Sequence, residues 1–246
     1  MADQATLRIF RGDRAGGQEV DYTVPVAPGM VVLDAVHAVQ AAHAPDLAVR
    51  WNCKAGRCGS CGAEVNGKPR LMCMDRMDKY PAGEPIAIRP MKAFPTIKDL
   101  VCDVSWNFRV NKKIPAFKPR PDPEPRFSQE EADRVQEFRK CIECFLCQDV
   151  CHVLRDHEQT EKFCGPRFLV RIAGLEMHPL DQENRVPLLK QELGIGLCNI
   201  TKCCTEVCPE SIHITDNAII PLKERVVDQF YDPVKKLFRI LLPGRP

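Results

Sequence analysis

The spacing of the cysteines constrains this chain more than any other feature. The 246 residues include fourteen cysteines, and residues 141–151 read CIECFLCQDVC, with four thiols in eleven residues. Disulfide frameworks are typical of small secreted domains, but this chain is not small, and MADQATLRIF lacks the pattern of a signal peptide. Thiols separated by only two to four residues instead indicate metal or iron–sulfur ligation in a reducing compartment.

The overall composition is that of a globular protein long enough for two domains. The chain is 44% hydrophobic and 28% charged, so it has enough apolar residues to form cores. The formal net charge is only +2, and we therefore expect no nucleic-acid partner. No segment approaches the roughly 20 consecutive apolar residues that cross a bilayer.

The first hundred residues carry mostly strand signals. Residues 6–10 and 20–26 alternate apolar and polar positions, and the glycine-rich stretch between them, RGDRAGGQE, is interpreted as their connection. Residues 30–43 have the apolar spacing of an amphipathic helix. Asn66-Gly67 is a hairpin-turn signal, and PIAIR at 85–89 indicates a further strand. This pattern predicts a small mixed sheet that grips one helix.

The second half of the chain is predicted to be helical. Residues 114–127 contain five prolines, which predicts a stiff, extended segment with little capacity to pack. Directly after it, Ser128 and Glu131 form an S-x-x-E capping box. Helical spacing then recurs in 166–177, 186–193 and 219–230.

These signals predict an α+β protein with three segments. We expect a sheet domain over residues 1–105, a proline-rich connection over 106–127 and an all-helical domain over 128–246.

The first cysteine group predicts a 2Fe–2S cluster. Cys53, Cys58, Cys61 and Cys73 follow the C-x4-C-x2-C spacing, with a more distant fourth cysteine, of plant-type (β-grasp) ferredoxins. The glycines around them let backbone amides approach the sulfurs, and such hydrogen bonds stabilise anionic sulfur. Zinc also accepts four thiolates, but zinc sites favour paired C-x2-C knuckles, so the spacing favours the cluster.

The second cysteine group predicts a 4Fe–4S cluster. Bacterial ferredoxins use C-x2-C-x2-C-x3-C-P, in which the fourth cysteine binds the other cluster of a pair. Cys141, Cys144 and Cys147 begin one copy of this motif, and Cys208, which is followed by Pro209, ends a second copy. Together these four cysteines form a complete 4Fe–4S set in a domain of the bacterial-ferredoxin type.

The third group lacks one cysteine. The second copy of the motif starts at Cys198 and has Thr201 at the position that Cys144 occupies in the first copy. The second cluster is therefore left with three cysteines: Cys198 and Cys204 of its own copy, and Cys151, the fourth cysteine of the first copy. Three thiolates hold a cubane that lacks one corner, and we therefore predict a 3Fe–4S cluster. Cys203 competes with Cys204, but only Cys204 keeps the three-residue gap before Cys208. The thiols left over, interpreted as buried or incidental, are Cys102, Cys164 and Cys203.

A plant-type ferredoxin domain followed by two interleaved cubane motifs resembles the iron–sulfur subunit of succinate dehydrogenase and fumarate reductase, respiratory complex II. The resemblance rests on RWNCKAGRCGSCG, on the cysteine at position 73, on CIECFLC and on the C-x5-C-x3-CP run, and it covers nearly the whole chain. It implies an electron-transfer subunit without a substrate-oxidising site of its own. Electrons from FAD on a partner flavoprotein would pass singly through the 2Fe–2S, 4Fe–4S and 3Fe–4S clusters to quinone.

The same resemblance implies that the N-terminal domain docks the flavoprotein and that the C-terminal domain docks a membrane-anchor subunit. The chain would then be peripheral, on the cytoplasmic side of the cell membrane. The chain departs from the family's quinone-pocket pattern, because HVLRDHE contains no tryptophan and Asn199 follows the third-group cysteine where the family has histidine. His152, Asn199 and Lys202 are therefore candidates by position alone.

Residues 234–246, VKKLFRILLPGRP, have two interpretations. They form either a basic amphipathic helix that contacts an anchor protein or lipid headgroups, or a terminal helix packed on its own domain.

Three other functions stay open at this point. The first is fumarate reductase, which runs the same machinery in reverse. The second is a structural module that binds several zinc ions. The third is the iron–sulfur subunit of another flavin dehydrogenase.

Overall fold

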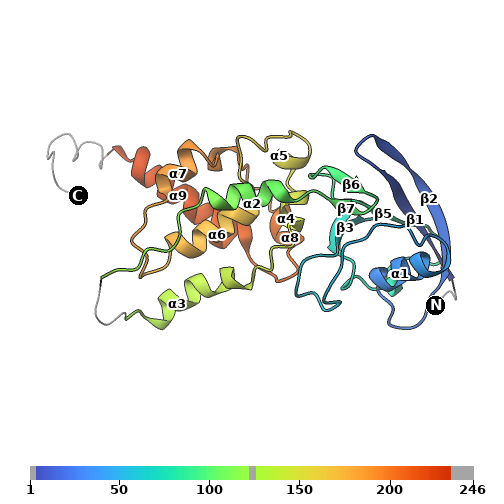
Figure 1. Ribbon diagram of the computed structural model, residues 1–246. Helices are drawn as coiled ribbons and strands as arrows, with labels where there is room; N and C mark the ends of the chain where they lie inside the picture. The colour runs from blue at the N-terminus through green and yellow to red at the C-terminus, as the bar shows by residue number, and fades with distance from the viewer. Residues whose placement is uncertain (1–3, 122–125, 234–246) are drawn as a thin grey trace.

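The molecule is elongated, with a β-sheet domain at one end and a helical domain at the other (Figure 1). The computed structural model describes residues 4–121 and 126–233. The N-terminal β-hairpin lies at the outer end of the sheet domain, and the last described helix lies at the far end of the helical domain (Figure 1). This matches the predicted α+β architecture.

The sheet domain is built from a five-stranded mixed sheet and one helix. The strands run in the spatial order β2-β1-β5-β3-β4, in which β1 and β5 are parallel and the other neighbours are antiparallel. A separate two-stranded ladder joins β6 and β7. The elements of this domain are β1 (Gln4–Asp13), β2 (Gly16–Pro25), α1 (Val32–Ala42), β3 (Gly62–Val65), β4 (Lys68–Leu71), η1 (Met77–Lys79), β5 (Ile86–Arg89), β6 (Thr96–Lys98) and β7 (Val101–Cys102).

Alternating apolar residues form the core of this domain. Leu7 and Ile9 on β1 and Val24 on β2 are buried and face the buried side of α1, as their period of two predicts. Asn66 and Gly67 have φ values of 48° and 74°, the left-handed pair that a tight hairpin between β3 and β4 requires. The prediction of a small mixed sheet that packs against one helix is confirmed.

The predicted connection between the first two strands is too long. β1 continues to Asp13 and β2 begins at Gly16, so only Arg14 and Ala15 form the turn. The glycines join the ladder, with Gly12 opposite Gly17. Glycine content alone therefore gave the wrong ends for these two strands. The hydrogen bonds between paired strands stabilise an extended backbone even where there are no side chains to pack.

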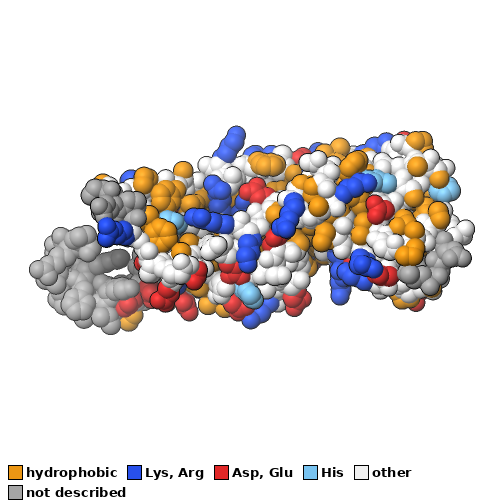
Figure 2. Space-filling view, turned by 90° about the horizontal axis from the view of Figure 1, so that it is seen from below, with side chains coloured by type: hydrophobic (Ala, Val, Ile, Leu, Met, Phe, Trp, Pro, Cys, Tyr) orange, Lys and Arg blue, Asp and Glu red, His pale blue; other side chains and the backbone are white. Residues whose placement is uncertain are grey.

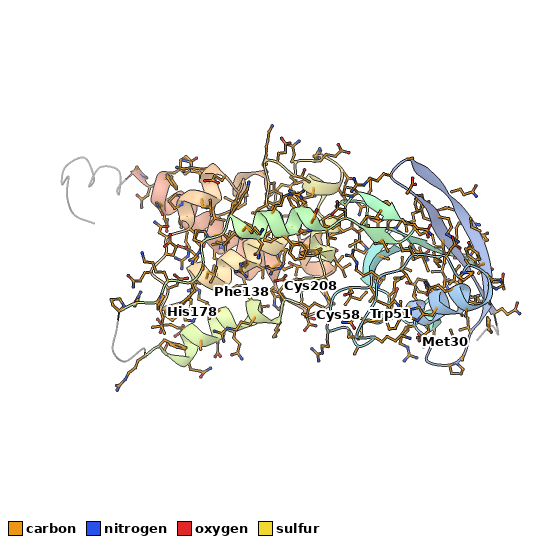
Figure 3. All side chains as sticks on the ribbon, in the orientation of Figure 1. Met30, Trp51, Cys58, Phe138, His178 and Cys208 are labelled. Carbon is orange, nitrogen blue, oxygen red and sulfur yellow. The ribbon has the colours of Figure 1, made fainter. Side chains whose placement is uncertain are left out.

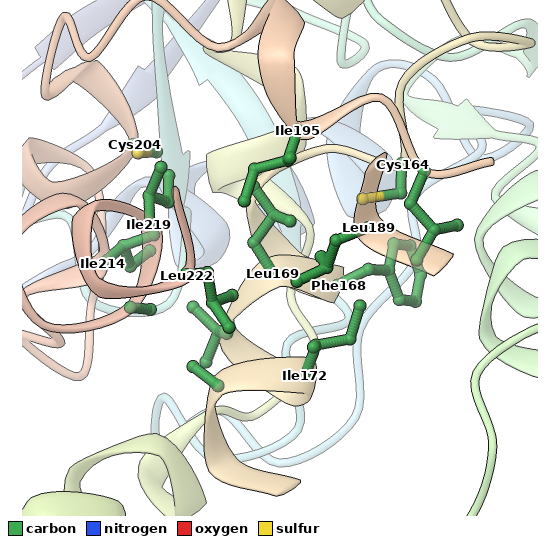
Figure 4. Packing of buried hydrophobic residues seen from close by; sticks show 14 of the residues in the cluster. Cys164, Phe168, Leu169, Ile172, Leu189, Ile195, Cys204, Ile214, Ile219 and Leu222 are labelled. Carbon is green, nitrogen blue, oxygen red and sulfur yellow. The ribbon is translucent and has the colours of Figure 1, made fainter. Parts of the chain in front are cut away.

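The helical domain consists of short helices joined by the cysteine-bearing loops. Its elements are α2 (Ser105–Lys112), α3 (Gln129–Gln136), η2 (Glu137–Lys140), α4 (Leu146–Asp149), α5 (His152–Arg155), α6 (Pro166–Glu176), α7 (Val186–Gln191), η3 (Ile195–Leu197), α8 (Cys203–Glu206), the π-helical turn η4 (Ile214–Ile219) and α9 (Ile220–Phe230). The predicted capping box is confirmed, because Glu131 N donates to Ser128 Oγ and Ser128 N donates to Glu131 Oε2. Helix α6 is the centre of the core, and Phe168, Leu169 and Ile172 pack among side chains of α7, η4 and α9 (Figure 4).

The proline-rich segment is held by backbone hydrogen bonds, although the side chains of residues 115–121 are exposed. Arg120 N donates to the carbonyl of Leu180, and the fully buried guanidinium of Arg185 donates to the carbonyls of Pro115 and Ala116. The expectation of little packing therefore holds for the side chains of 115–121, whereas backbone carbonyls, which an extended chain leaves without partners, accept hydrogen bonds from the buried arginine. Helix α2 was not expected, and its Val110 contributes to the helical core.

Two further observations bear on membrane attachment. Among residues 4–121 and 126–233, no helix is long and apolar enough to cross a bilayer. The tail at 234–246, for which two interpretations were open, lies outside the described residues.

Candidate iron–sulfur sites

The first cysteine group lies in one loop and the hairpin that follows it. Cys53, Cys58 and Cys61 lie between α1 and β3, and Cys73 lies two residues after the end of β4. The pairing of Gly62 with Leu71 across the hairpin brings Cys61 and Cys73 together, and Met72 N donates to the carbonyl of Cys61. The structure therefore brings all four predicted residues of this group into one region.

Backbone amides surround these sulfurs. Ala55 N and Arg57 N lie 3.4 and 3.3 Å from Cys53 Sγ, and Gly56 N lies 3.3 Å from Cys73 Sγ. Hydrogen bonds of this kind favour the thiolate over the thiol.

The thiols of this group differ in how readily they ionise. Burial disfavours the thiolate of Cys58, but hydrogen bonds from Ser60 and Cys53 outweigh it and lower its pKa to about 6. Burial raises the pKa of Cys61 to about 12, and the neighbouring Cys73 contributes smaller effects in both directions. The loop thus offers a partly buried thiol that ionises readily, Cys58, and a buried thiol, Cys61, that needs a cation to ionise.

The second group lines one small apolar pocket in the helical domain. The pocket is lined by all four cysteines of the group and by apolar side chains that include Phe145 and Val170; the four are Cys141, Cys144, Cys147 and Cys208. Burial, followed by the neighbouring cysteines, raises the pKa of Cys147 well above its usual value. Burial likewise raises the pKa of Cys144 to about 12. Such thiols stay protonated unless a metal compensates the thiolate charge, so the donor set fits an iron–sulfur cluster.

The third group converges from three separate segments. Burial is the main cause that raises the pKa of Cys151 to about 12 and that of Cys204 to about 11, and Cys203 raises both further. Cys198 also contributes to the shift of Cys204. Cys151, Cys198, Cys203 and Cys204 are therefore close enough to interact electrostatically.

The two bacterial-type motifs have the same backbone. Cys141 and Cys198 each cap a 3₁₀ helix, with φ/ψ of −63°/115° and −73°/120°. The residues two and four positions later adopt left-handed φ in both copies: Glu143, Phe145, Ile200 and Lys202. Four-residue helices follow in the same register, α4 at Leu146–Asp149 and α8 at Cys203–Glu206. The structure thus repeats residue by residue from Cys141 and from Cys198.

In this repeat, Thr201 is equivalent to Cys144. Likewise, Cys203 is equivalent to Leu146, and Cys204 to Cys147. Thr201 is exposed, and its Oγ1 lies 3.3 Å from Cys203 Sγ. Leu146 points away from the cysteine pocket of its own copy and packs against the N-terminal core. Sequence spacing predicted the alignment, but the left-handed residues of the repeat could not be read from non-glycine side chains.

Two of the leftover cysteines are buried, and the three positional candidates are partly or fully exposed. Cys102 and Cys164 are buried, with thiols 3.6 Å from the carbonyls of Met91 and Gly165. His152 is half-buried beside His157, with ring centroids 6.0 Å apart. Asn199 and Lys202 are exposed.

In the described residues, these thiols form neither a disulfide nor a site arranged for a single metal ion. All fourteen cysteines are free. Over residues 4–121 and 126–233, no three His, Cys, Asp or Glu side chains are arranged to hold one metal ion.

Comparison with known proteins identifies the class of these domains. Residues 6–109 match the family model for a 2Fe–2S iron-sulfur cluster binding domain, and residues 137–212 match that for a 4Fe–4S dicluster domain. The chain is therefore an iron–sulfur protein with a plant-type ferredoxin domain and a two-cluster helical domain.

Full-length relatives identify the family. The chain is 30% identical over 234 residues to the succinate dehydrogenase iron-sulfur subunit of Bacillus subtilis, covering 87% of this chain and 90% of that protein. It is also 30% identical to the fumarate reductase iron-sulfur subunit of Wolinella succinogenes, covering 92% and 99%. A chain of the Mycobacterium smegmatis Sdh1 complex in the apo form is 58% identical, with a TM-score of 0.92, over 95% of this chain and 100% of that one. The chain belongs to the family of electron-transferring iron–sulfur subunits of succinate dehydrogenase and fumarate reductase.

Proposed function

We propose that this chain relays electrons from succinate to quinone within a succinate dehydrogenase. The direction of electron transfer, from succinate to quinone, is inferred from the full-length similarity to a chain of the Sdh1 complex. In this proposal FAD lies on a partner flavoprotein, and the chain itself has no substrate-oxidising site. Iron–sulfur clusters accept and release single electrons, and the protein fixes their positions and potentials.

We propose the following ligand sets. The 2Fe–2S cluster is held by Cys53, Cys58, Cys61 and Cys73; the 4Fe–4S cluster by Cys141, Cys144, Cys147 and Cys208; and the 3Fe–4S cluster by Cys151, Cys198 and Cys204. The backbone repeat supports these sets, because Cys204 takes the place of Cys147, whereas Cys203 takes that of Leu146, which points away from the pocket. At Thr201, the position of the missing fourth ligand, the side chain offers no thiolate.

The rim of the first site has the composition of a docking surface, and we assign the flavoprotein to it. Trp51 and Met74 are 47% and 54% exposed. Lys54 and Arg57 flank them, and Lys54 Nζ lies 5.0 Å from the Trp51 ring centroid. Exposed Trp, Met and Arg are enriched at the centres of protein interfaces. Figure 3 shows Trp51 and Cys58 on the same side of the sheet domain.

The third site lies beside a second exposed apolar surface, and we assign the membrane-anchor subunit and the quinone to it. Leu197 and Ile200, which flank Cys198, are 43% and 39% exposed. Elsewhere, on the face shown in Figure 2, basic and acidic side chains are interspersed along the molecule. The chain then sits peripherally on the cytoplasmic side of the cell membrane, held by the anchor rather than by a helix of its own.

Initial rates in both directions test this function. The intact complex, purified from membranes with its partner subunits, is assayed for succinate-dependent quinone reduction and for quinol-dependent fumarate reduction. We expect the first rate to exceed the second. A dominant fumarate-reducing rate would instead assign the chain to a fumarate reductase, and absence of both rates in an iron-replete complex would point to another flavin dehydrogenase.

A further inference from the structure

The junction of the two domains contains an unusually close backbone contact. A Cβ atom on Gly59 would lie 2.7 Å from Cys144 Cα and 3.0 Å from both Cys144 N and Cys144 Cβ. Contacts this short are absent from well-packed proteins, so only glycine allows the two loops to approach in this way. Gly59 belongs to the loop of the first cysteine group, and Cys144 belongs to the second group.

A neighbouring glycine extends the same contact. A Cβ atom on Gly62, at the start of β3, would lie 3.2 Å from Leu146 Cδ2, 3.3 Å from Met91 Sδ and 3.6 Å from the carbonyl oxygen of Cys144. Two glycines, three residues apart, thus face one short segment of the first bacterial-type motif.

Polar contacts also hold this segment against the sheet domain. Arg155 Nη2 lies 2.9 Å from Glu64 Oε1, and Ala93 N donates to Asp149 Oδ1 at 2.9 Å. Residues 144–155 are therefore fixed to the N-terminal domain at several points, and the backbone of Cys144 has little room to move away from Gly59.

We propose that Gly59, supported by Gly62, is a positioning residue that sets the separation between the first and second iron–sulfur clusters. This inference rests on the proposed function, because it requires that both cysteine groups hold clusters. Electron tunnelling slows exponentially with distance, and magnetic dipolar coupling between two centres falls with the inverse cube of their distance. The closest approach of the two loops therefore determines both quantities.

A methyl group at position 59 would separate the loops. The atoms in its way are backbone atoms of Cys144, not the end of a flexible side chain, so they cannot rotate aside. The two backbones would have to move apart by about 1 Å before the contact became an ordinary van der Waals contact.

The test is Gly59→Ala in the purified complex, reduced with dithionite and measured by electron paramagnetic resonance. We expect the signals of both centres at wild-type intensity, with weaker dipolar coupling between them and slower electron transfer from the first to the second. Two intact signals with unchanged coupling would overturn the proposal.

Gly67→Ala is the matched control. Gly67 has φ +74°, close to the +69° of Gly59, but nothing lies within 4 Å of its Cβ position. It therefore introduces the same left-handed backbone strain without any contact between the domains, and we expect wild-type coupling. An equal loss of coupling in Gly67→Ala would show that strain, rather than contact with Cys144, is responsible, and would overturn the proposal.

A second variant tests the proposal if the Gly59→Ala complex does not assemble its 2Fe–2S cluster. Gly62→Ala crowds Leu146 of the same segment, together with Met91, from a strand position that has no left-handed φ, but the atoms it meets are side-chain ends that can shift. We expect a smaller loss of coupling in the same sense, and unchanged coupling would contradict the inference. If the wild-type complex itself shows no iron–sulfur signals, the proposed function fails instead, so the two failures are distinguishable.

Discussion

The two bacterial-type motifs share a backbone but differ in what covers them. In the first copy, Cys144 and Leu146 are buried against Gly59 and Gly62 of the sheet domain. In the second copy, the corresponding Thr201 is exposed and Cys203 is partly exposed. The first copy is thus covered by another part of the same chain, whereas the second presents the equivalent face to solvent. We infer that electrons enter the helical domain through the covered copy and leave through the open one.

The largest effect that we predict separates the two adjacent cysteines of the open copy. Cys204→Ala should abolish the signal of the third centre, because Cys204 matches Cys147 in the repeat. Cys203→Ala should keep that signal, because Cys203 matches Leu146. Iron content and the electron paramagnetic resonance spectrum of the oxidised complex measure both variants, and the reverse result would show that the repeat misassigns the ligand.

Restoring the missing cysteine should make the two copies alike. Thr201→Cys places a thiol where Cys144 stands in the first copy, and we expect the three-iron centre to become a 4Fe–4S centre with a lower midpoint potential. The signal of the oxidised three-iron centre should therefore decrease or disappear. Ile200→Cys, one residue away, is the control and should leave the oxidised spectrum as it is.

The contact that covers the first copy should contribute measurable stability. Arg155→Met leaves Glu64 and Asp149, two buried carboxyl groups that face each other, without their cation. Removing one partner of a buried ion pair of this kind costs about 3 kcal/mol. Lys92→Met breaks the exposed pair with Asp156 at the same junction and should cost about 0–1 kcal/mol. Denaturant unfolding of the holoprotein compares the two, and equal losses would mean that Arg155 does not hold the domains together.

The smallest effect concerns a cation at the open copy. Lys223 Nζ donates to the carbonyl of Cys198 at 2.5 Å. Lys223→Met removes this positive charge and should lower the midpoint potential of the third centre slightly, by less than Thr201→Cys does, whereas Lys223→Arg should restore it. A redox titration of the third-centre signal measures both, and a potential that is the same in all three proteins would rule out a role for Lys223.

The features that could be predicted from the sequence are those fixed by local spacing. The C-x4-C-x2-C run, the offsets from Cys141 and Cys198, the turn at Asn66-Gly67 and the capping box at Ser128 each depend on a few consecutive residues. Local chemistry determines them, and the structure contains the predicted turn and cap.

The features that could not be predicted depend on contacts between distant segments. The burial of Arg185 against Pro115 and Ala116 and the approach of Gly59 to Cys144 join residues about 70 or more positions apart. In the sequence, Gly59 is indistinguishable from the other glycines of its loop. Only the tertiary structure shows that its missing side chain makes room for a second domain.

Low-temperature electron paramagnetic resonance of the anaerobically purified complex tests the presence of the three clusters. We expect a three-iron signal in the oxidised protein, and a 2Fe–2S signal that appears on reduction with dithionite. A colourless protein that contains zinc in place of iron, and is silent in both states, would contradict this expectation.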